Sequence, residues 1–372
     1  MLTTGERQRA GTCDVVVVGA GLVGAAIAAR LTQQGFDTAV LEARRVGGGA
    51  TGRSLGVVFP GLAGHYSWVV SVYGRQRARE IWALTAGGRA RLVETARALG
   101  VPFRRTESFS LAVDDEEADV LWESVKLLRQ DGFDASFTLT DPLGRGFQGA
   151  LRRPDDVVVN AAELTRALLA GEDIVVHEGT EVYALEPTPD GVRVWAQGRT
   201  VICSAVVLAV NGYAALVDPY LAERVAPVSA YVLVAEPDDE PFVEPPCTFD
   251  HGRAFLRTLP DGRLLLGVRQ RDDVLTPGGL LRDRMMGVVS RHFPELDLAK
   301  ADKWSEIMGF TPDGLPLLGR LPNLPDAYFA VGFEGHGLSW AFVVAERLVS
   351  AMLHDAELGL LSARRLEEDD LA

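Results

Sequence analysis

The chain has 372 residues, enough for two domains or one large interleaved domain, and 47% of them are hydrophobic, which favours a sizeable core over disorder. Its 51 acidic and 37 basic side chains give a net charge of −14, which argues against nucleic acid and anionic membrane surfaces as partners. Because the first residues are polar, no apolar run could span a membrane and the three cysteines form no CxxC pair, we expect a cytoplasmic protein without a metal site.

A glycine motif near the N-terminus is the most informative local pattern. Residues 13–18 form a short β-branched run typical of a buried parallel strand, and Gly19, Gly21 and Gly24 follow it as G-x-G-x-x-G. In this motif the first glycine permits a sharp turn, the second lets a pyrophosphate approach the backbone, and the third lets the helix pack on the strand. The helix predicted over 22–34 would direct its N-terminal amides at that phosphate.

The segment after this helix completes the pattern. A second strand is predicted over 38–41 and ends at Glu42, whose carboxylate can accept hydrogen bonds from a ribose diol. An acidic rather than a basic residue at this point favours FAD or NAD over NADP. Three glycines alone could form a turn that binds nothing, but here strand, glycines, helix, strand and acid arrive in the required order.

A second glycine-rich stretch, ARRVGGGATGRSLG at residues 43–56, leads into the apolar run 56–59 and indicates a surface of close backbone approach to a flat ligand. The nucleotide motif, the acid and GGGATGRS together resemble the start of the D-amino-acid oxidase superfamily, especially its glycine oxidase and sarcosine oxidase types. The resemblance implies that this loop contacts the pyrophosphate and the flavin ring. It makes Arg53 a candidate for the N5/C4=O side of the flavin; an arginine on the surface is the alternative.

The middle of the chain departs from the nucleotide-binding pattern. After an aromatic, irregular segment at 61–68, we expect a long helix over about 74–99, a strand at 108–113 and an amphipathic helix at 115–129. The chain is expected to return to the first domain over 155–185. There the predicted elements are a strand at 156–160, a helix at 161–170, a strand at 174–177 and the start of a meander at 180–185.

Further strands follow a hairpin turn at 187–191. An almost wholly apolar strand is predicted at 201–210, and it ends at Asn211 and Gly212 beside the nucleotide. The remaining predicted elements are antiparallel strands at 225–236, 254–259 and 264–268, a hairpin at Asp261–Gly262, a loop at 237–246, a helix at 283–293 and a frayed acidic tail at 367–370.

The C-terminal part carries a second signature. Residues 309–319 (GFTPDGLPLLG) and 328–332 (YFAVG) precede GHGLS at 335–339, which opens an apolar helix at 340–353. This order resembles the TPDG-x-P…GHG pattern of the same superfamily, although 335–337 alone could be an ordinary strand-to-helix turn. A helix N-terminus presents amides and the positive end of a dipole. The resemblance implies that this end faces the N1–C2=O side of the flavin.

The two signatures bracket the chain, so the resemblance covers nearly all of it. The predicted fold is of the α/β (mixed α+β) class, with a Rossmann-like FAD-binding domain interleaved with an antiparallel-sheet substrate domain. We expect the FAD-binding domain at 1–74, 152–224 and 305–372, and the substrate domain at 75–151 and 225–304.

The residues assigned to FAD lie in the glycine stretches and at strand ends, and the resemblance adds Val182 at the adenine. They are Gly19, Gly21, Leu22, Val23, Gly24, Glu42, Ala43, Arg44, Gly49, Ala50, Thr51, Arg53, Ser54, Val182, Asn211, Gly212, Gly309, Gly335, His336, Gly337, Leu338 and Ser339. Superfamily members that bind flavin covalently carry a histidine or cysteine where Arg53 and Glu306 stand here, so we predict noncovalent FAD.

The resemblance implies oxidation of a C–N bond in an amino acid or in a primary or secondary amine, by hydride transfer to flavin N5 and hydrolysis of the imine. Molecular oxygen or another acceptor would then reoxidise the flavin. One alternative is a flavin monooxygenase using NADPH, a class that resembles a different C-terminal pattern, Gly-Asp-Ala. Another is the FAD-binding subunit of a multi-subunit dehydrogenase.

Arg257, Tyr231 and His251 are the predicted substrate-binding or catalytic residues. Arg257 lies where glycine oxidase-like members place a carboxylate-binding arginine, and a solvent-facing strand arginine is the alternative. A second superfamily arginine position holds Phe310 here, which favours a bulkier or less anionic amine. The aromatic side chains of 65–68 could wall the pocket or pack in the core.

Overall fold

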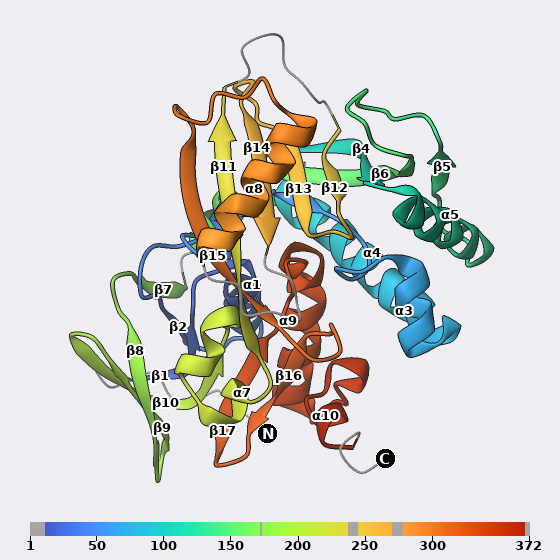
Figure 1. Ribbon diagram of the computed structural model, residues 1–372. Coiled ribbons are helices and arrows are strands. Elements are labelled where there is room, and N and C mark those ends of the chain that lie inside the picture. Colours follow the sequence, from blue (N-terminus) through green and yellow to red (C-terminus); the bar gives the residue numbers. More distant parts are fainter. Residues whose placement is uncertain (1–11, 172, 237–244, 270–277, 369–372) are drawn as a thin grey trace.

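Two β-sheets organise the computed structural model, which describes residues 12–171, 173–236, 245–269 and 278–368. The first sheet occupies the lower half of the view in Figure 1 and the second sheet the upper half. The chain crosses between them repeatedly, because strands of the first sheet come from segments that lie before, between and after the strands of the second. This arrangement confirms the expected mixed α/β fold class.

The first sheet has a parallel core that fits a buried, Rossmann-like arrangement. Its order is β17 (Leu324–Val331), β10 (Arg199–Leu208), β1 (Thr12–Val18), β2 (Thr38–Leu41) and β7 (Ile174–His177). The antiparallel strand β16 (Leu317–Leu321) forms one edge, and the hairpin of β8 (Val182–Thr188) and β9 (Gly191–Ala196) pairs with β10. The central valines 15–17 are fully buried, which is why this strand is apolar throughout.

Helices pack on the first sheet through close backbone contacts. Helix α1 (Leu22–Gln33) lies against α9 (Gly337–His354) and α6 (Ala161–Leu169), and the long helix α4 (Arg75–Ala98) packs on α9. A Cβ atom on Gly24 would overlap the carbonyl oxygen of Gly19, and Gly19 itself has φ +102°. The glycine motif therefore has the packing role that the sequence predicted for it.

The second sheet is antiparallel except for one parallel pair, β12 with β4. Its order is β15 (Asp302–Phe310), β11 (Ala226–Ala235), β14 (Leu264–Arg269), β13 (Ala254–Thr258), β12 (Cys247–Phe249), β4 (Phe103–Leu111), β6 (Ala150–Val159) and β3 (Val57–Val58), with β5 (Ser136–Thr138) on β6. Helix α8 (Gly278–His292) covers one face through Leu281, Met285 and Val289. The opposite face is free to line a cavity.

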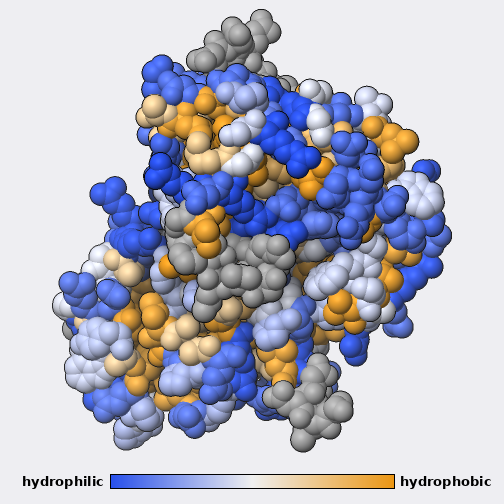
Figure 2. Space-filling view, viewed as in Figure 1, coloured by the Kyte–Doolittle hydropathy of each residue, from blue (hydrophilic) through white to orange (hydrophobic). Residues whose placement is uncertain are grey.

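The remaining helices complete the described chain. They are α2 (Ala50–Arg53), α3 (Tyr66–Tyr73), α5 (Asp115–Gln130), η1 (Asn211–Leu216), α7 (Pro219–Ala222), η2 (Gly359–Leu361) and α10 (Arg365–Glu368). Figure 2 shows hydrophobic side chains gathered at the lower left of this face, over the region that holds β10 and α7 in Figure 1. Among the described residues, no helix is both long enough and apolar enough to span a membrane.

Several local expectations need correction. The strand expected at 156–160 in the first domain is the end of β6, because Val157 and Val158 pair with β3 and β4 in the second sheet. The segment expected to be irregular enters helix α3 at Tyr66, where Ser67 bonds to Ser124 of α5, a tertiary contact that local patterning does not reveal. Strands β12 and β15 have no counterpart among the predicted elements. Residues 237–244 of the expected loop at 237–246 lie outside the described residues, as do residues 369–370 of the expected acidic tail, whose first two residues end helix α10. The domain boundaries stay a prediction.

Candidate active site

A cavity of about 690 Å³ opens between the two sheets and is lined by both signatures. At one end it is bordered by the first glycine turn, the end of β2 and the second glycine loop. At the other it reaches the face of the second sheet that α8 does not cover, where Ala230 and Val232 of β11 and Phe255 of β13 form an apolar wall. Such a cavity is large enough for a cofactor together with a small substrate.

The nucleotide end is built mainly from backbone. Gly21 caps α1 without any side-chain hydrogen bond, and the first turn of α1 contains no acidic residue, so the positive end of the helix dipole faces the cavity. The carboxylate of Glu42 accepts hydrogen bonds from the backbone N–H groups of Ala20 and Arg44, each at 2.8 Å. These bonds hold the carboxylate at the end of β2, as a residue that recognises ribose requires.

The second glycine loop contacts the first. It contains the short helix α2, and Thr51 Oγ1 accepts a hydrogen bond from Leu22 N at 3.1 Å. A Cβ atom on Gly21 would lie 3.2 Å from the same oxygen. The two glycine-rich segments thus meet at the entrance to α1, and both line the cavity.

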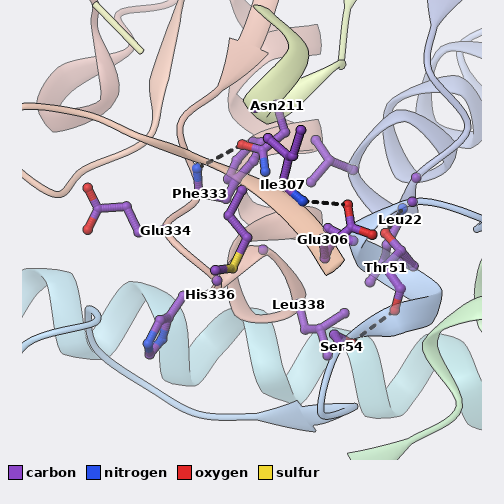
Figure 3. Close-up of a pocket in the computed structure, with 18 of the residues that line it drawn as sticks. Leu22, Thr51, Ser54, Asn211, Glu306, Ile307, Phe333, Glu334, His336 and Leu338 are labelled. Atoms are coloured by element: carbon purple, nitrogen blue, oxygen red, sulfur yellow. Dashed lines mark hydrogen bonds between the residues drawn. The ribbon is translucent and has the colours of Figure 1, made fainter. Parts of the chain in front are cut away.

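The strand-to-helix turn before α9 lies on the other side of the cavity from Leu22 and Thr51, as Figure 3 shows. Asn211, at the end of β10 with φ +45°, accepts hydrogen bonds through Oδ1 from Gly332 N and Phe333 N at 3.0 and 3.1 Å. This side chain therefore connects the ends of β10 and β17. Gly335 has φ +82°, and His336 follows as the N-cap of α9 without a side-chain capping bond.

Arg53 is more than a surface arginine. Its Nη1 lies 3.3 Å from Oε2 of Glu306 and donates to Ser305 O at 3.2 Å, which connects α2 to β15. Glu306 is 5% exposed and lines the cavity (Figure 3), and its burial raises the pKa of the carboxyl against the opposing effects of Ile307 N–H and Arg53. Arg53 and Glu306 thus form an ion pair beside the glycine loops, in which the carboxylate is buried and the Arg53 side chain is 38% exposed.

Most of the residues assigned to FAD line this cavity. The three that do not are Gly24, Gly309 and Ser339. They serve packing instead: a Cβ atom on Gly309 would lie 2.8 Å from Asn211 Oδ1, and Ser339 Oγ donates to Phe59 O. Sequence reasoning groups them with the ligand-facing residues because a motif does not separate its packing positions from its contact positions.

The predicted catalytic residues do not line the cavity. Strand alternation sends Tyr231 to the α8 face of the second sheet, while Ala230 and Val232 face the cavity. His251 has φ +53° and donates its backbone N–H to Glu117. Arg257 lies against Gly56, with Nε and Nη1 buried and without hydrogen-bond partners, and burial together with Arg104 lowers its pKa to about 10.

Two arginines that sequence reasoning missed do line the cavity. Arg153 of β6 has an 11% exposed side chain held by Asp156, Ser108 and Ser110, and Arg269, at the end of β14, is 6% exposed. Both lie near His336: burial and these two cations lower the pKa of His336 to about 4, and its Nδ1 is buried without a partner. A charged residue that ends the apolar run LLLGVR was the available signal for Arg269.

His65 also lines the cavity and belongs to a cluster with Glu117 and His251. The candidate ligand atoms of these three side chains lie within 4.8 Å of one another, the one such group of three or more among the described residues. However, both oxygens of Glu117 already accept hydrogen bonds, from Val113 N, His251 N and His65 Nε2. Both carboxylate oxygens of Glu117 are therefore satisfied without a metal.

A parallel sheet with this glycine signature, closed on one side by a second sheet that carries cations, defines a dinucleotide-dependent oxidoreductase. The family model described as "FAD dependent oxidoreductase" matches residues 14–351. The chain belongs to this family, the D-amino-acid oxidase superfamily, and is an FAD-dependent enzyme.

Known relatives and solved structures agree with this assignment. The chain is 26% identical over 375 residues to gamma-glutamylputrescine oxidoreductase of Escherichia coli (strain K12), covering 93% of this chain and 85% of that protein. It is 26% identical over 350 residues to glycine oxidase of Geobacillus kaustophilus (strain HTA426), covering 87% and 89%. The crystal structure of glycine oxidase from Geobacillus kaustophilus matches with a TM-score of 0.75 at 23% identity, over 94% of this chain and 96% of that one. The crystal structure of L-proline dehydrogenase from P. horikoshii matches with a TM-score of 0.76 at 21% identity, over 96% and 98%.

Proposed function

We propose that the enzyme oxidises the C–N bond of an amine that also carries a carboxylate, and that Arg153 and Arg269 bind this carboxylate. The observation that carries the proposal is the pair of largely buried arginines on the cavity wall, close to the His336 turn at the flavin signature. Glycine oxidase and gamma-glutamylputrescine oxidoreductase, by their names, act on small amino compounds. FAD, when bound, supplies the hydride acceptor for such an oxidation.

Arg153 has a free edge for a ligand. Its Nε donates to Ser108 Oγ and Asp156 Oδ2, both at 3.1 Å, and its Nη1 donates to Ser110 Oγ at 3.0 Å. Among the described residues, no group accepts a hydrogen bond from Nη2. A guanidinium fixed along one side and open on the other is suited to a carboxylate, and its rigid mounting keeps the entropic cost of binding low.

Arg269 supplies the positive charge that is missing at position 310, where this chain has a phenylalanine. Its guanidinium carbon lies 5.0 Å from the centre of the Phe310 ring, and Phe310 stands where relatives in the superfamily place an arginine. The positive charge thus comes from β14, while β15 supplies the aromatic surface beneath it. This arrangement argues against the expectation that Phe310 favours a less anionic amine.

The rest of the wall sets the chemistry around the substrate. Val232, Phe255 and Leu62 exclude water, which strengthens the electrostatic attraction between the arginines and an anion. Because its pKa is lowered to about 4, His336 stays neutral near pH 7 and adds no third positive charge. It can donate or accept one hydrogen bond at the flavin signature.

We also propose that FAD is held noncovalently. Arg53 and Glu306 occupy the two attachment positions of the covalent types, and none of the three cysteines lines the cavity. Acid precipitation of the yellow protein should leave all flavin in the supernatant. Flavin retained in the pellet would contradict this proposal.

The visible spectrum tests the reaction. The purified protein is mixed anaerobically with glycine, N-methyl amino acids, cyclic imino acids, D- and L-amino acids, and matching amines without a carboxylate. We expect the visible band of the oxidised flavin to bleach with a carboxylate-bearing amine and much less with its decarboxylated partner. Bleaching by NADPH alone would instead favour the monooxygenase. Admission of air to the reduced protein then separates an oxidase, whose flavin is reoxidised by oxygen, from a dehydrogenase.

One relative keeps the multi-subunit alternative open. The chain is 24% identical over 387 residues to a subunit of the opine oxidase of Rhizobium meliloti, covering 95% of this chain and 98% of that protein. The name marks that relative as one part of a larger oxidase. If the present chain acts likewise, it will bind FAD alone but turn over only with a partner, which the same spectral experiment reveals as flavin that no amine bleaches.

A further inference from the structure

The proposed reaction requires a proton acceptor in the cavity. Hydride leaves the carbon next to nitrogen only when the nitrogen lone pair is available to form the imine, so the neutral amine is the reactive form. An alkyl ammonium such as that of lysine has a pKa of about 10.4, and near pH 7 the substrate therefore arrives protonated. A side chain with an available lone pair beside the substrate would accelerate this step.

Most titratable groups that line the described cavity either lie at its nucleotide end or already form a hydrogen bond or an ion pair. Glu42, Glu181, Tyr183 and Tyr213 belong to the nucleotide end, Glu306 is paired with Arg53, and Glu334 accepts from Thr311 N. His336 binds a proton only near pH 4. The hydroxyl of Tyr66 donates to Asp131 at 2.8 Å, and burial and that carboxylate raise its pKa. His65 is the remaining candidate.

The orientation of His65 leaves one ring nitrogen for a ligand. The side chain is 11% exposed, and Nε2 lies 3.2 Å from Oε1 of Glu117, which is fully buried. Hydrogen bonds from His65, Val113 N and His251 N lower the pKa of Glu117 against the effect of its burial, so the carboxylate stays ionised. An ionised carboxylate can only accept a hydrogen bond, so Nε2 must carry the proton and Nδ1 keeps its lone pair.

The surroundings of His65 do not compete for Nδ1. Among the described residues, Nδ1 makes no hydrogen bond, and His65 lines the cavity together with Gly64 and Tyr66. The other titratable group that faces the ring is His251, at 5.6 Å between ring centres. Neighbouring Asp250 forms ion pairs with Arg253 and Arg284.

We propose that His65 accepts the ammonium proton of the substrate at Nδ1 and that Glu117 orients it for this step. One N–H bond of the ammonium breaks, its electron pair stays on the nitrogen, and the proton forms a new Nδ1–H bond. The product is a neutral amine beside an imidazolium that is paired with the Glu117 carboxylate. Breaking a buried ion pair costs several times more free energy than breaking an ion pair at the surface, so the orientation of His65 is stable. This inference rests on the proposed C–N oxidation.

Rapid-mixing kinetics of flavin reduction test the proposal. With the best amine of the panel at pH 7, we expect His65→Gln to reduce flavin about 100-fold more slowly. The rate should recover as the pH approaches the pKa of the free amine and also when imidazole is added. His354→Gln, which removes an exposed histidine at the end of α9, should keep the parental rate and pH profile.

Two results would overturn the proposal. One is a His65→Gln protein that retains FAD and shows the parental rate and pH profile. The other comes from nitrogen-15 NMR of the unmodified protein, which reads the tautomer without turnover: a proton on Nδ1 of His65 contradicts it, and a proton on Nε2 supports it. If no amine bleaches the parent protein, the proposed C–N oxidation by this chain alone fails and the role of His65 fails with it.

Discussion

The two ends of the cavity are built by different means. The nucleotide end consists largely of glycines and backbone amides, most of them within the first 56 residues or in the turn before α9, and Glu42, Glu181, Tyr183 and Tyr213 add side chains to it. The substrate end consists of side chains from β6, β11, β13 and β14, which come from distant parts of the chain. A cofactor common to many enzymes is held by features that tolerate little change, whereas substrate choice depends on side chains that different strands can supply.

The largest effect should follow a change at the nucleotide end. We expect Gly24→Ala to abolish retention of FAD and lower the melting temperature, because the added Cβ overlaps the carbonyl oxygen of Gly19 where α1 meets β1. Gly87→Ala in α4 is the matched control, since its Cβ would meet no atom within 4 Å and alanine favours the helix. The flavin-to-protein absorbance ratio and thermal unfolding measure both. Full flavin content in Gly24→Ala would remove the basis for this comparison.

A change at the substrate end should leave the cofactor bound. Arg153→Met is expected to weaken binding of benzoate, a carboxylate probe followed through the flavin spectrum, by about 100-fold, because a buried charge-assisted contact is lost. Arg152→Met is the control from the adjacent position, since that side chain points to the other face of β6 and pairs with Glu107 at the surface. Equal affinities in the two variants would show that Arg153 does not bind the carboxylate.

A third prediction tests whether Arg257 binds the substrate or only destabilises the folded protein. Two of its guanidinium nitrogens are buried without partners, so Arg257→Met should raise the free energy of unfolding by about 1 kcal/mol while the KM for the substrate changes less than about threefold. Urea unfolding and steady-state kinetics measure the two quantities. A large rise in KM would instead support the role that the resemblance implies for Arg257.

The smallest effect concerns acid stability. The pKa of His336 is lowered from 6.5 to about 4 in the folded protein, so the unfolded chain binds more protons between these values. The contribution of His336 to stability is therefore present above about pH 6.5 and declines as the pH falls towards 4. We expect the parent to lose about 2 kcal/mol more than His336→Gln between pH 7 and pH 4.5 in urea unfolding. Parallel losses would show that folding does not lower the pKa of His336.

Local pattern accounts for much of the fold. The predicted strand at 38–41 and the helices at 115–129 and 161–170 agree with the observed elements to within one residue at either end, because hydrophobic period and capping residues are local properties. The three valines within 156–160 and the helix after them suit a βα unit, which is why the pattern places this strand in the first domain. Pairing with β3 and β4 decides otherwise, and no local signal reports a strand's partner.

The substrate residues show the same limit at the level of side chains. Residue type and analogy of position select Tyr231 and Arg257, yet neither lines the cavity. A shift of one residue along a strand reverses the face to which a side chain points, so Tyr231 lies on the α8 face while Val232 lines the cavity. Residue type alone therefore cannot separate Arg153 from Arg152 until the strand register is known.

The sequence by itself determined the superfamily, the FAD cofactor and the nucleotide end, because a sharp turn, a close backbone approach and a helix N-terminus are encoded within short segments. Only the tertiary structure decided which cations face the substrate and that His65 is held by Glu117 beside it. These groups come from separate strands, helices and turns, and their meeting depends on sheet order and on the direction of each side chain. Neither property is contained in any short stretch of the chain.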